Sequence, residues 1–243
     1  MPATPAWPPR SLPRLFVDQP LAEAIAILVE DKPAHYLANV LRLSEGDEVL
    51  LFNGDNGEWR ATIEAAHKKK LVLRALAQVQ PAEALPPLTL AFAPVKRAPL
   101  EWLIEKATEL GVANLQPVIT QRTIVERLNP DRLMAIAIEA AEQCGRTRLP
   151  ALAAPMKLDA LLASDHGHLL FADETGGAPL TAAAVPGPTT ILTGPEGGFT
   201  PEERSRILAA EATGIGLGPR ILRAETAALA AIALYMAAAG DWR

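Results

Sequence analysis

The sequence predicts an α/β protein with a small strand-rich part at its N-terminus and a larger part in which strands alternate with helices. Two observations carry this prediction. Residues 11–80 are patterned mainly as strands, and apolar runs of strand length alternate with helical periodicity after residue 88. This alternation favours a mostly parallel sheet covered on both faces. The proline-rich segment 81–87, PAEALPP, lacks periodicity, so we expect two domains, residues 1–80 and 88–243, joined by this linker.

The N-terminal prediction depends on apolar runs separated by turn residues. An Asn53–Gly57 segment with the composition of a tight turn separates two of the runs. The expected strands are Val49–Phe52, Trp59–Ile63 and Leu71–Leu76. Residues Ala34–Leu43 have apolar side chains at helical spacing and predict one short helix.

The C-terminal prediction depends on strand-length runs, on helical stripes and on helix-start signals. Thr200-Pro201-Glu202-Glu203 is a capping box with proline at the first helical position. The expected strands are Leu88–Ala93, Asn114–Ile119, His168–Ala172, Thr189–Thr193 and Ile215–Leu217. The expected helices cover Pro99–Leu110, about 130–144, about 201–213 and about 225–239.

Composition and charge exclude several classes of protein. The single cysteine, Cys144, excludes a disulfide scaffold and a CxxC metal site, and the four histidines lack metal-ligand spacing, so we expect no metal. The longest uncharged apolar run, Thr226–Gly240, is too short to span a bilayer, and MPATPAWPPR lacks the apolar core of a signal peptide. We expect a cytoplasmic protein with no membrane role. The net charge of −5 argues against nonspecific coating of nucleic acid but permits local basic patches.

Two glycine-bearing loops indicate a ligand pocket. Gly194–Gly198, GPEGG, follows one predicted strand, and Leu217–Arg223 follows the next, so we expect two adjacent strand-end loops to form one pocket. The alternative is that both loops are only tight turns. The sequence GIGLG at 214–218 is similar to a dinucleotide fingerprint, but Pro219-Arg220 stands where the helix would begin. This break disfavours a Rossmann-type enzyme.

Five sequence blocks in the same order resemble the RsmE family of ribosomal RNA uridine N3-methyltransferases, which is part of the SPOUT class. The blocks are His35–Asp47, Glu105–Val112, Glu139–Arg146 with Pro150, GPEGGFTPEE at 194–203, and LGPRILRAETAALAAI at 217–232. The resemblance implies an N-terminal PUA-like, RNA-binding β-barrel and a C-terminal SPOUT α/β domain with a trefoil knot. It also implies a homodimer and 16S ribosomal RNA, free or in the small ribosomal subunit, as the substrate.

The resemblance further implies that S-adenosylmethionine binds in the knot loops, largely through backbone. The expected cofactor-binding residues are Leu192, Thr193, Gly194, Glu196, Gly197, Gly198, Leu217, Gly218, Ile221, Leu222 and Thr226. The expected catalytic residues are Arg223, which would stabilise charge on the uracil carbonyls or contact a phosphate, and Glu225. Glu225 would be the general base, or would pair with Arg223 and stabilise the start of the last helix.

Several cations are candidates for contacts with RNA because arginine suits phosphate forks and base stacking. They are Arg10, Arg14, Arg42, Lys96, Arg122 and Arg146, and each could instead form a structural ion pair. Two other functions remain open from the sequence. One is a SPOUT methyltransferase that acts on another RNA position or atom, and the other is an RNA-binding module without catalysis.

Overall fold

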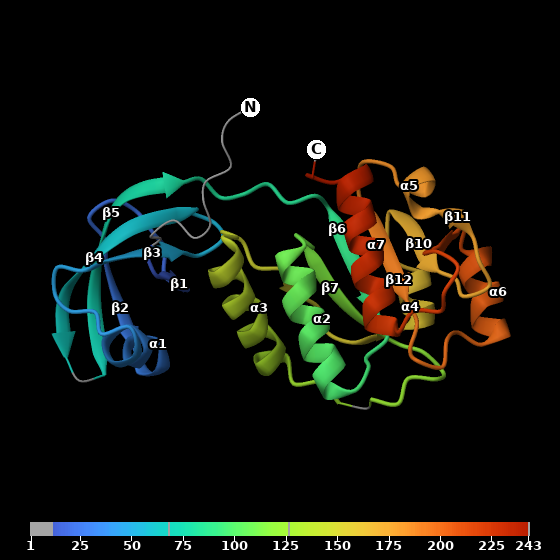
Figure 1. The fold of residues 1–243 in the computed structure, drawn as a ribbon, viewed down its shortest axis with the longest axis horizontal. Helices are drawn as coiled ribbons and strands as arrows, with labels where there is room; N and C mark the ends of the chain where they lie inside the picture. Colours follow the sequence, from blue (N-terminus) through green and yellow to red (C-terminus); the bar gives the residue numbers. More distant parts are fainter. Residues whose placement is uncertain (1–11, 68, 126, 243) are drawn as a thin grey trace. The chain divides into compact units, whose positions relative to one another are not determined.

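The computed structural model describes residues 12–67, 69–125 and 127–242, and the chain divides into two compact units (Figure 1). The first unit consists of Met1–Glu83 and Gly145–Arg148, and the second consists of Ala84–Cys144 and Leu149–Arg243. The chain therefore leaves the second unit after Cys144 for only four residues, which fold with the first unit. No pattern in the sequence indicates this return.

The first unit is built on a five-stranded sheet. The strands are β1 (Arg14–Phe16), β2 (Ala26–Glu30), β3 (Glu48–Phe52), β4 (Glu58–His67) and β5 (Lys70–Gln80). Their order is β1-β3-β4-β5-β2, with β1 parallel to β3 and the other pairs antiparallel. Alternate residues of these strands face a common core; in β2, for example, Ile27 and Val29 are buried and Leu28 is exposed.

The predicted turn between β3 and β4 is confirmed. The Asn53 side-chain oxygen accepts hydrogen bonds from the backbone N–H groups of Asp55 and Asn56, at 3.1 and 2.8 Å, which closes the turn. Gly57 has a φ of +72°, and a Cβ there would lie 2.2 Å from the Gln80 carbonyl oxygen. Only glycine fits at that position.

The predicted N-terminal helix is present but begins three residues earlier than expected. It consists of α1 (Asp31–His35) followed by the π-helical turn η1 (Tyr36–Val40). Pro33 lies in the first turn, where a missing N–H breaks no intrahelical hydrogen bond. Arg42 follows in the left-handed region, with a φ of +60°, which costs a non-glycine residue about 1 kcal/mol.

The second unit contains a parallel sheet of eight strands. They are β6 (Leu88–Phe92), β7 (Asn114–Ile119), β8 (Ala151–Leu152), β9 (Met156–Lys157), β10 (His168–Ala172), β11 (Ala178–Pro179), β12 (Thr189–Thr193) and β13 (Thr213–Gly216). The order is β11-β13-β10-β12-β6-β7-β8, with β9 beside β7, and every pair is parallel. The five predicted strands are all present, and β8, β9 and β11 were not predicted because two residues carry no periodicity.

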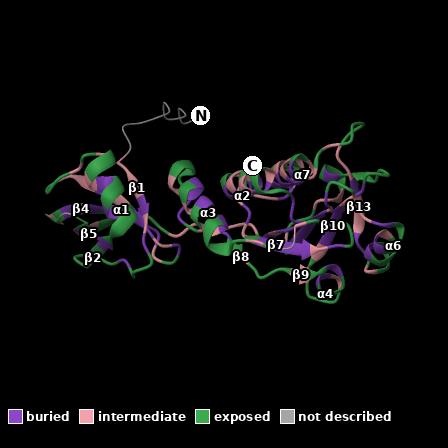
Figure 2. Ribbon diagram, turned by 90° about the horizontal axis from the view of Figure 1, so that it is seen from below, coloured by how far each residue is buried: buried purple, intermediate pink, exposed green. Residues whose placement is uncertain are grey.

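Helices cover both faces of this sheet, as predicted (Figure 2). The helices are α2 (Arg97–Glu109), α3 (Pro130–Cys144), α4 (Leu158–Leu162), α5 (Leu180–Ala183), α6 (Pro201–Ala209) and α7 (Ala224–Ala238). One core joins α2, α3, α5 and α7 to one face of the sheet, and the other joins α4 and α6 to the opposite face. Successive residues of the central strands alternate between the two cores; Ile191 belongs to the first and Leu192 to the second.

In the described part of the chain, no helix has the length and apolar character that crossing a membrane requires.

Candidate functional site

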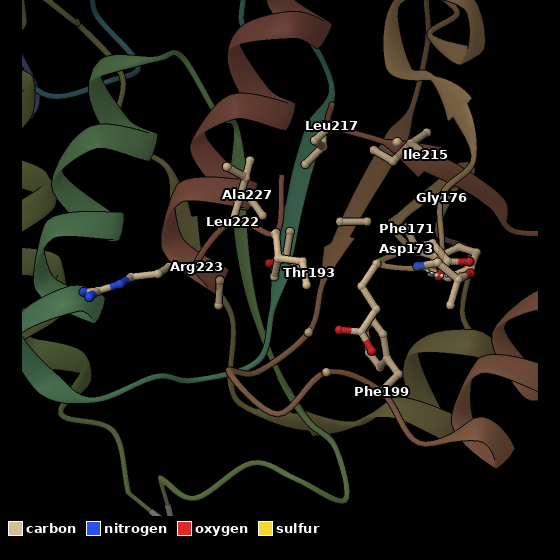
Figure 3. Close-up of a pocket in the computed structure, with 18 of the residues that line it drawn as sticks. Phe171, Asp173, Gly176, Thr193, Phe199, Ile215, Leu217, Leu222, Arg223 and Ala227 are labelled. Atoms are coloured by element: carbon tan, nitrogen blue, oxygen red, sulfur yellow. Dashed lines mark hydrogen bonds between the residues drawn. The ribbon is translucent and has the colours of Figure 1, made fainter. Parts of the chain in front are cut away.

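A cavity of about 570 Å³ opens at the carboxyl ends of three neighbouring strands of the second unit (Figure 3). Its walls are the loop after β10, the loop after β12, the loop after β13 and the first turn of α7. Ligand sites of α/β sheets lie at this edge of the sheet, and pockets for small molecules have volumes of about 300–1,000 Å³. The position and size of the cavity therefore fit a nucleotide-sized ligand.

The strand order corrects one expectation. The loops after β12 and β13 do form one cavity, but their strands are not neighbours, because β10 lies between them. The loop after β10 consequently forms the middle of the cavity wall, through residues 172–176. The sequence signal for this loop is the pair Gly176-Gly177 after a predicted strand, which the prediction from the GPEGG and GIGLG segments did not use.

Two glycines of the loop after β12 lie in close contacts. A Cβ at Gly194 would lie 3.1 Å from the ring of Phe199, which folds back beneath it and meets Phe171 edge to face. Gly198 has a φ of +67°, and a Cβ there would lie 3.0 Å from the carboxylate of Glu174. The GPEGG segment is therefore shaped to bring its backbone and the loop after β10 close together.

The glycines around β13 serve another purpose. A Cβ at Gly177 would lie 2.2 Å from the Gly214 carbonyl oxygen, and a Cβ at Gly216 would lie 3.1 Å from the Gly177 carbonyl oxygen. These glycines let the backbone leading into β11 lie close beside β13, with which β11 pairs in parallel, and this packing accounts for the glycines of GIGLG. Gly218 differs because it has a φ of +106° and open space where a Cβ would be, and it lines the cavity.

A buried carboxylate fixes the loop after β10. Asp173, whose side chain is 4% exposed, accepts two hydrogen bonds from the Arg204 guanidinium, at 2.7 and 2.9 Å. Its other oxygen accepts from the N–H and hydroxyl of Thr175, at 3.0 and 2.8 Å. Burial by itself raises the pKa of Asp173, but these hydrogen bonds outweigh it and leave the pKa below its ordinary value. Asp173 is thus held as a carboxylate.

The loop after β12 is also tied to the loop after β7. Glu203, in the first turn of α6, is 1% exposed and completes the predicted capping box with Thr200. One of its carboxylate oxygens accepts from the Thr200 N–H at 3.0 Å, and the other accepts from the Gln121 N–H at 2.7 Å. Beside it, the Arg122 guanidinium donates to the Gly197 carbonyl oxygen.

Most of the predicted cofactor residues come together at the cavity. Three do not line it: Leu192 is buried in the core behind it, Gly197 contacts the Arg122 side chain, and Thr226 is exposed on α7. Those that line the cavity are Thr193, Gly194, Glu196, Gly198, Leu217, Gly218, Ile221 and Leu222. The lining residues that the sequence analysis missed include Phe171, Asp173, Glu174, Thr175, Phe199 and Arg204.

The two predicted catalytic residues occupy different environments. Arg223 is the exposed N-cap of α7 and lies at the edge of the cavity. In Figure 3 its side chain extends away from the other labelled side chains. Glu225 is 8% exposed, lies in the first turn of α7 and is not among the residues that line the cavity.

The cations expected to contact RNA also separate by burial. Arg14 and Arg146 have side chains that are 11% and 6% exposed, whereas Arg42, Lys96 and Arg122 are exposed. Lys96 and Arg122 lie in unit 2 after β6 and β7, at the same edge of the sheet as the cavity. Arg10 lies outside the described residues.

Arg14 is held by several partners inside the first unit. Its Nε donates to Glu58 at 2.5 Å, its Nη2 donates to the Arg146 carbonyl oxygen at 2.7 Å, and its guanidinium lies 4.5 Å from the centre of the Phe52 ring. Arg146 in turn pairs with Glu83 at 3.4 Å. These contacts favour structural roles for both arginines.

Among the residues that the structure describes, no three His, Cys, Asp or Glu side chains gather in a way that could hold a metal ion.

Comparisons with known proteins agree with this architecture. A family model for an RNA methyltransferase domain matches residues 82–236, and one for an RNA methyltransferase PUA domain matches residues 29–76. The chain is 35% identical over 227 residues to ribosomal RNA small subunit methyltransferase E of Rickettsia conorii, covering 90% of this chain and 93% of that protein. It is 29% identical over 240 residues to the Bacillus subtilis protein of the same name, covering 90% of this chain and 94% of that protein.

A solved structure agrees as well. The chain is similar to the crystal structure of ribosomal RNA small subunit methyltransferase E from Neisseria gonorrhoeae, which is bound to S-adenosyl methionine. The two structures compare with a TM-score of 0.86 and 28% sequence identity, over 96% of this chain and 100% of that chain. The predicted fold class, an N-terminal PUA domain followed by a SPOUT α/β domain, is confirmed. The trefoil knot stays a prediction. The chain belongs to the ribosomal RNA small subunit methyltransferase E family, which is the RsmE family that its sequence resembles.

Proposed function

We propose that this protein transfers the methyl group of S-adenosylmethionine to N3 of a specific uridine in 16S ribosomal RNA. The single observation that supports this most is the cavity at the carboxyl edge of the second unit, because two of the sequence blocks that resemble the RsmE family, 194–203 and 217–232, supply two of its walls. The family membership supports methyl transfer to ribosomal RNA, and the position and size of the cavity support a site for the cofactor. The choice of N3 of uridine depends on the resemblance alone.

The residues of the cavity fit S-adenosylmethionine. This cofactor supplies a methyl group activated on a sulfonium cation and also carries a carboxylate. Within the described part of the chain, no ion pair holds the lining carboxylates Glu174 and Glu196 or the lining cations Arg220 and Arg223. Charges of both signs at the cavity therefore have counterparts on the cofactor. Backbone groups of residues 193–198 and 217–222 would hold the rest of the molecule, with Gly218 leaving space for a close approach. Leu192 and Gly197 would contribute to cofactor binding indirectly, by supporting this wall from behind. Thr226 would contribute from the first turn of α7.

The reaction requires control of one proton. N3 of uracil is protonated at neutral pH and lies on the Watson–Crick edge, so the base must be unpaired or flipped out. Arg223, at the rim, would stabilise the charge that develops on the uracil carbonyls as the N3 proton leaves, or would hold an adjacent phosphate. Glu225 would stabilise the helix start that carries Arg223, because a carboxylate near a helix N-terminus is favourable.

The RNA would be held by exposed cations. We propose Lys96, at the edge of the sheet that carries the cavity, and Arg42, in the PUA domain, as phosphate contacts. Arg10 stays a prediction because it lies outside the described residues. Residues 1–80 would then serve mainly RNA binding and residues 88–243 methyl transfer, with 81–87 as the connection.

Two further parts of the proposal concern assembly and location. We propose a homodimer, with α7 as an interface element, because this helix is rich in alanine and carries an exposed Leu234. Small residues permit close approach of helices. We also propose that the protein acts in the cytoplasm, where its ribosomal substrate would be found.

The decisive experiment is methyl transfer to small ribosomal subunits that lack the modification, with the product nucleoside identified by mass spectrometry. We expect 3-methyluridine. Any other methylated nucleoside would contradict the specific assignment and favour another SPOUT activity. Binding of S-adenosylmethionine without transfer to RNA would contradict catalysis on this substrate.

A further inference from the structure

We infer that Arg122 is a positioning residue for the glycine-rich loop after β12, and that its main role is to hold this loop in its cofactor-binding conformation instead of contacting RNA. Arg122 does not line the cavity. Its functional consequence rests on the proposed binding of S-adenosylmethionine, but the conformation of the loop can be tested without any ligand.

Arg122 contacts Gly197 through both its guanidinium and its aliphatic stem. The guanidinium donates from Nη1 to the Gly197 carbonyl oxygen. The aliphatic stem of the same side chain lies directly against the glycine, because a Cβ at Gly197 would be 3.2 Å from Arg122 Cδ and 3.5 Å from its Cβ. Arg122 therefore holds the outer side of the loop through both a hydrogen bond and packing.

The segment that carries Arg122 is itself fixed by hydrogen bonds. The Gln121 N–H donates to the buried carboxylate of Glu203, and Thr120 and Thr123 are joined by two hydrogen bonds of 2.9 Å. A hydrogen bond from a mobile segment would restrain little. Because the backbone on both sides of Arg122 is held, its side chain links the end of β7 firmly to the loop after β12.

The opposite side of the same loop forms part of the cavity wall. Gly194, Glu196 and Gly198 line the cavity, while Gly197 faces Arg122. Within the loop, the Gly198 N–H donates to the Pro195 carbonyl oxygen at 2.9 Å. Releasing the Gly197 carbonyl would therefore loosen the backbone that approaches the ligand, although no ligand contact is removed.

The test combines hydrogen exchange with calorimetry on the full chain. In Arg122→Ala we expect faster amide exchange at Gly198 and Thr200 without any ligand, because both amides are hydrogen-bonded inside the held loop. We expect the Kd for S-adenosylmethionine to rise roughly 3- to 30-fold, as for the loss of one charge-assisted hydrogen bond that is partly exposed to water. RNA affinity of the cofactor-free protein should stay within about twofold of wild type.

Three further variants separate positioning from other roles. Arg122→Lys keeps a donor and should recover part of the affinity. Gly197→Ala adds a Cβ against the Arg122 stem and should weaken cofactor binding by itself, but should add little in the Arg122→Ala background, where the opposing stem is absent. Arg206→Ala removes the same charge from a surface pair with Asp159 and serves as the matched control, with unchanged exchange and affinity.

Unchanged exchange at Gly198 and Thr200 in Arg122→Ala would overturn the inference, as would a loss of RNA affinity with an unchanged Kd for the cofactor. A failure of the proposed function looks different: wild-type protein would then bind no S-adenosylmethionine, while the exchange result in Arg122→Ala would still decide whether Arg122 holds the loop.

Discussion

Two arginines of the first unit (the PUA unit) and two of the second unit (the methyltransferase unit) serve different purposes. In the PUA unit, Arg14 and Arg146 have side chains that are nearly enclosed, and both are paired with carboxylates. In the methyltransferase unit, Arg220 and Arg223 are exposed at the cavity rim. The difference teaches that an arginine singled out by the sequence is not by itself a contact for RNA. Burial decides whether its charge is available to a substrate or is used to stabilise the fold.

The largest effect that tests this comparison is expected for Arg14→Ala. The substitution leaves the carboxylate of Glu58, which is 9% exposed, without its main partner. Removing one member of a buried pair costs about 3–5 kcal/mol. Chemical denaturation, followed by a probe in the PUA unit, should show this loss. A drop in RNA affinity with unchanged stability would instead make Arg14 a contact for RNA.

For Arg223→Ala we expect the opposite pattern, with a loss of rate and unchanged stability. Losing one group that stabilises developing charge lowers kcat by about 10²–10³-fold. Single-turnover methyl transfer and thermal unfolding, measured on the same preparation, check the prediction. If rate and RNA affinity both stay at the wild-type level, Arg223 has no part in the site.

Glu225→Gln separates the two roles considered for this residue. Because Glu225 is buried in the first turn of α7 and does not line the cavity, we expect a loss of about 0.3–1 kcal/mol in stability. Turnover should be largely retained. A loss of turnover by two orders of magnitude, with normal binding of the cofactor, would instead identify Glu225 as the general base.

The Asp173–Arg204 pair predicts a pH dependence. The pKa of Asp173 is lower in the folded protein than in the unfolded chain, so the pair stabilises the fold above the ordinary aspartate pKa of about 4. That contribution is lost as the pH falls through the lowered pKa. Between pH 6 and 8 the difference in Tm between wild type and Asp173→Asn should be constant, and it should shrink below about pH 4. A difference that keeps its full size at low pH would contradict this account.

The smallest effect is expected for Arg42→Gly in the PUA unit. Arg42 adopts a φ of +60°, so glycine should stabilise the fold by up to about 1 kcal/mol. If the exposed guanidinium contacts a phosphate, the same variant should lose RNA affinity. The slope of the logarithm of RNA affinity against the logarithm of salt concentration should then decrease in magnitude by about one. Greater stability with undiminished RNA binding would remove Arg42 from the RNA surface.

Local patterns in the sequence determined much of this protein. The apolar runs predicted the longer strands of the parallel sheet, and the Thr200 capping box predicted the start of α6. The glycine-bearing segments predicted two walls of the cavity. These features are predictable because they depend on residues within a few positions of each other. The family motifs added the fold and the class of reaction.

The tertiary structure decided the rest because it depends on contacts between distant residues. Only the strand order places β10 between β12 and β13, which makes the loop from Ala172 to Gly176 the middle of the cavity wall. Only the packing of the chain shows that Arg14 is nearly buried and paired with Glu58, and that Arg122 lies against Gly197. An arginine or lysine gives the same local sequence pattern whether its side chain is exposed to water or paired with a carboxylate. Its role therefore follows from burial, which the fold alone creates.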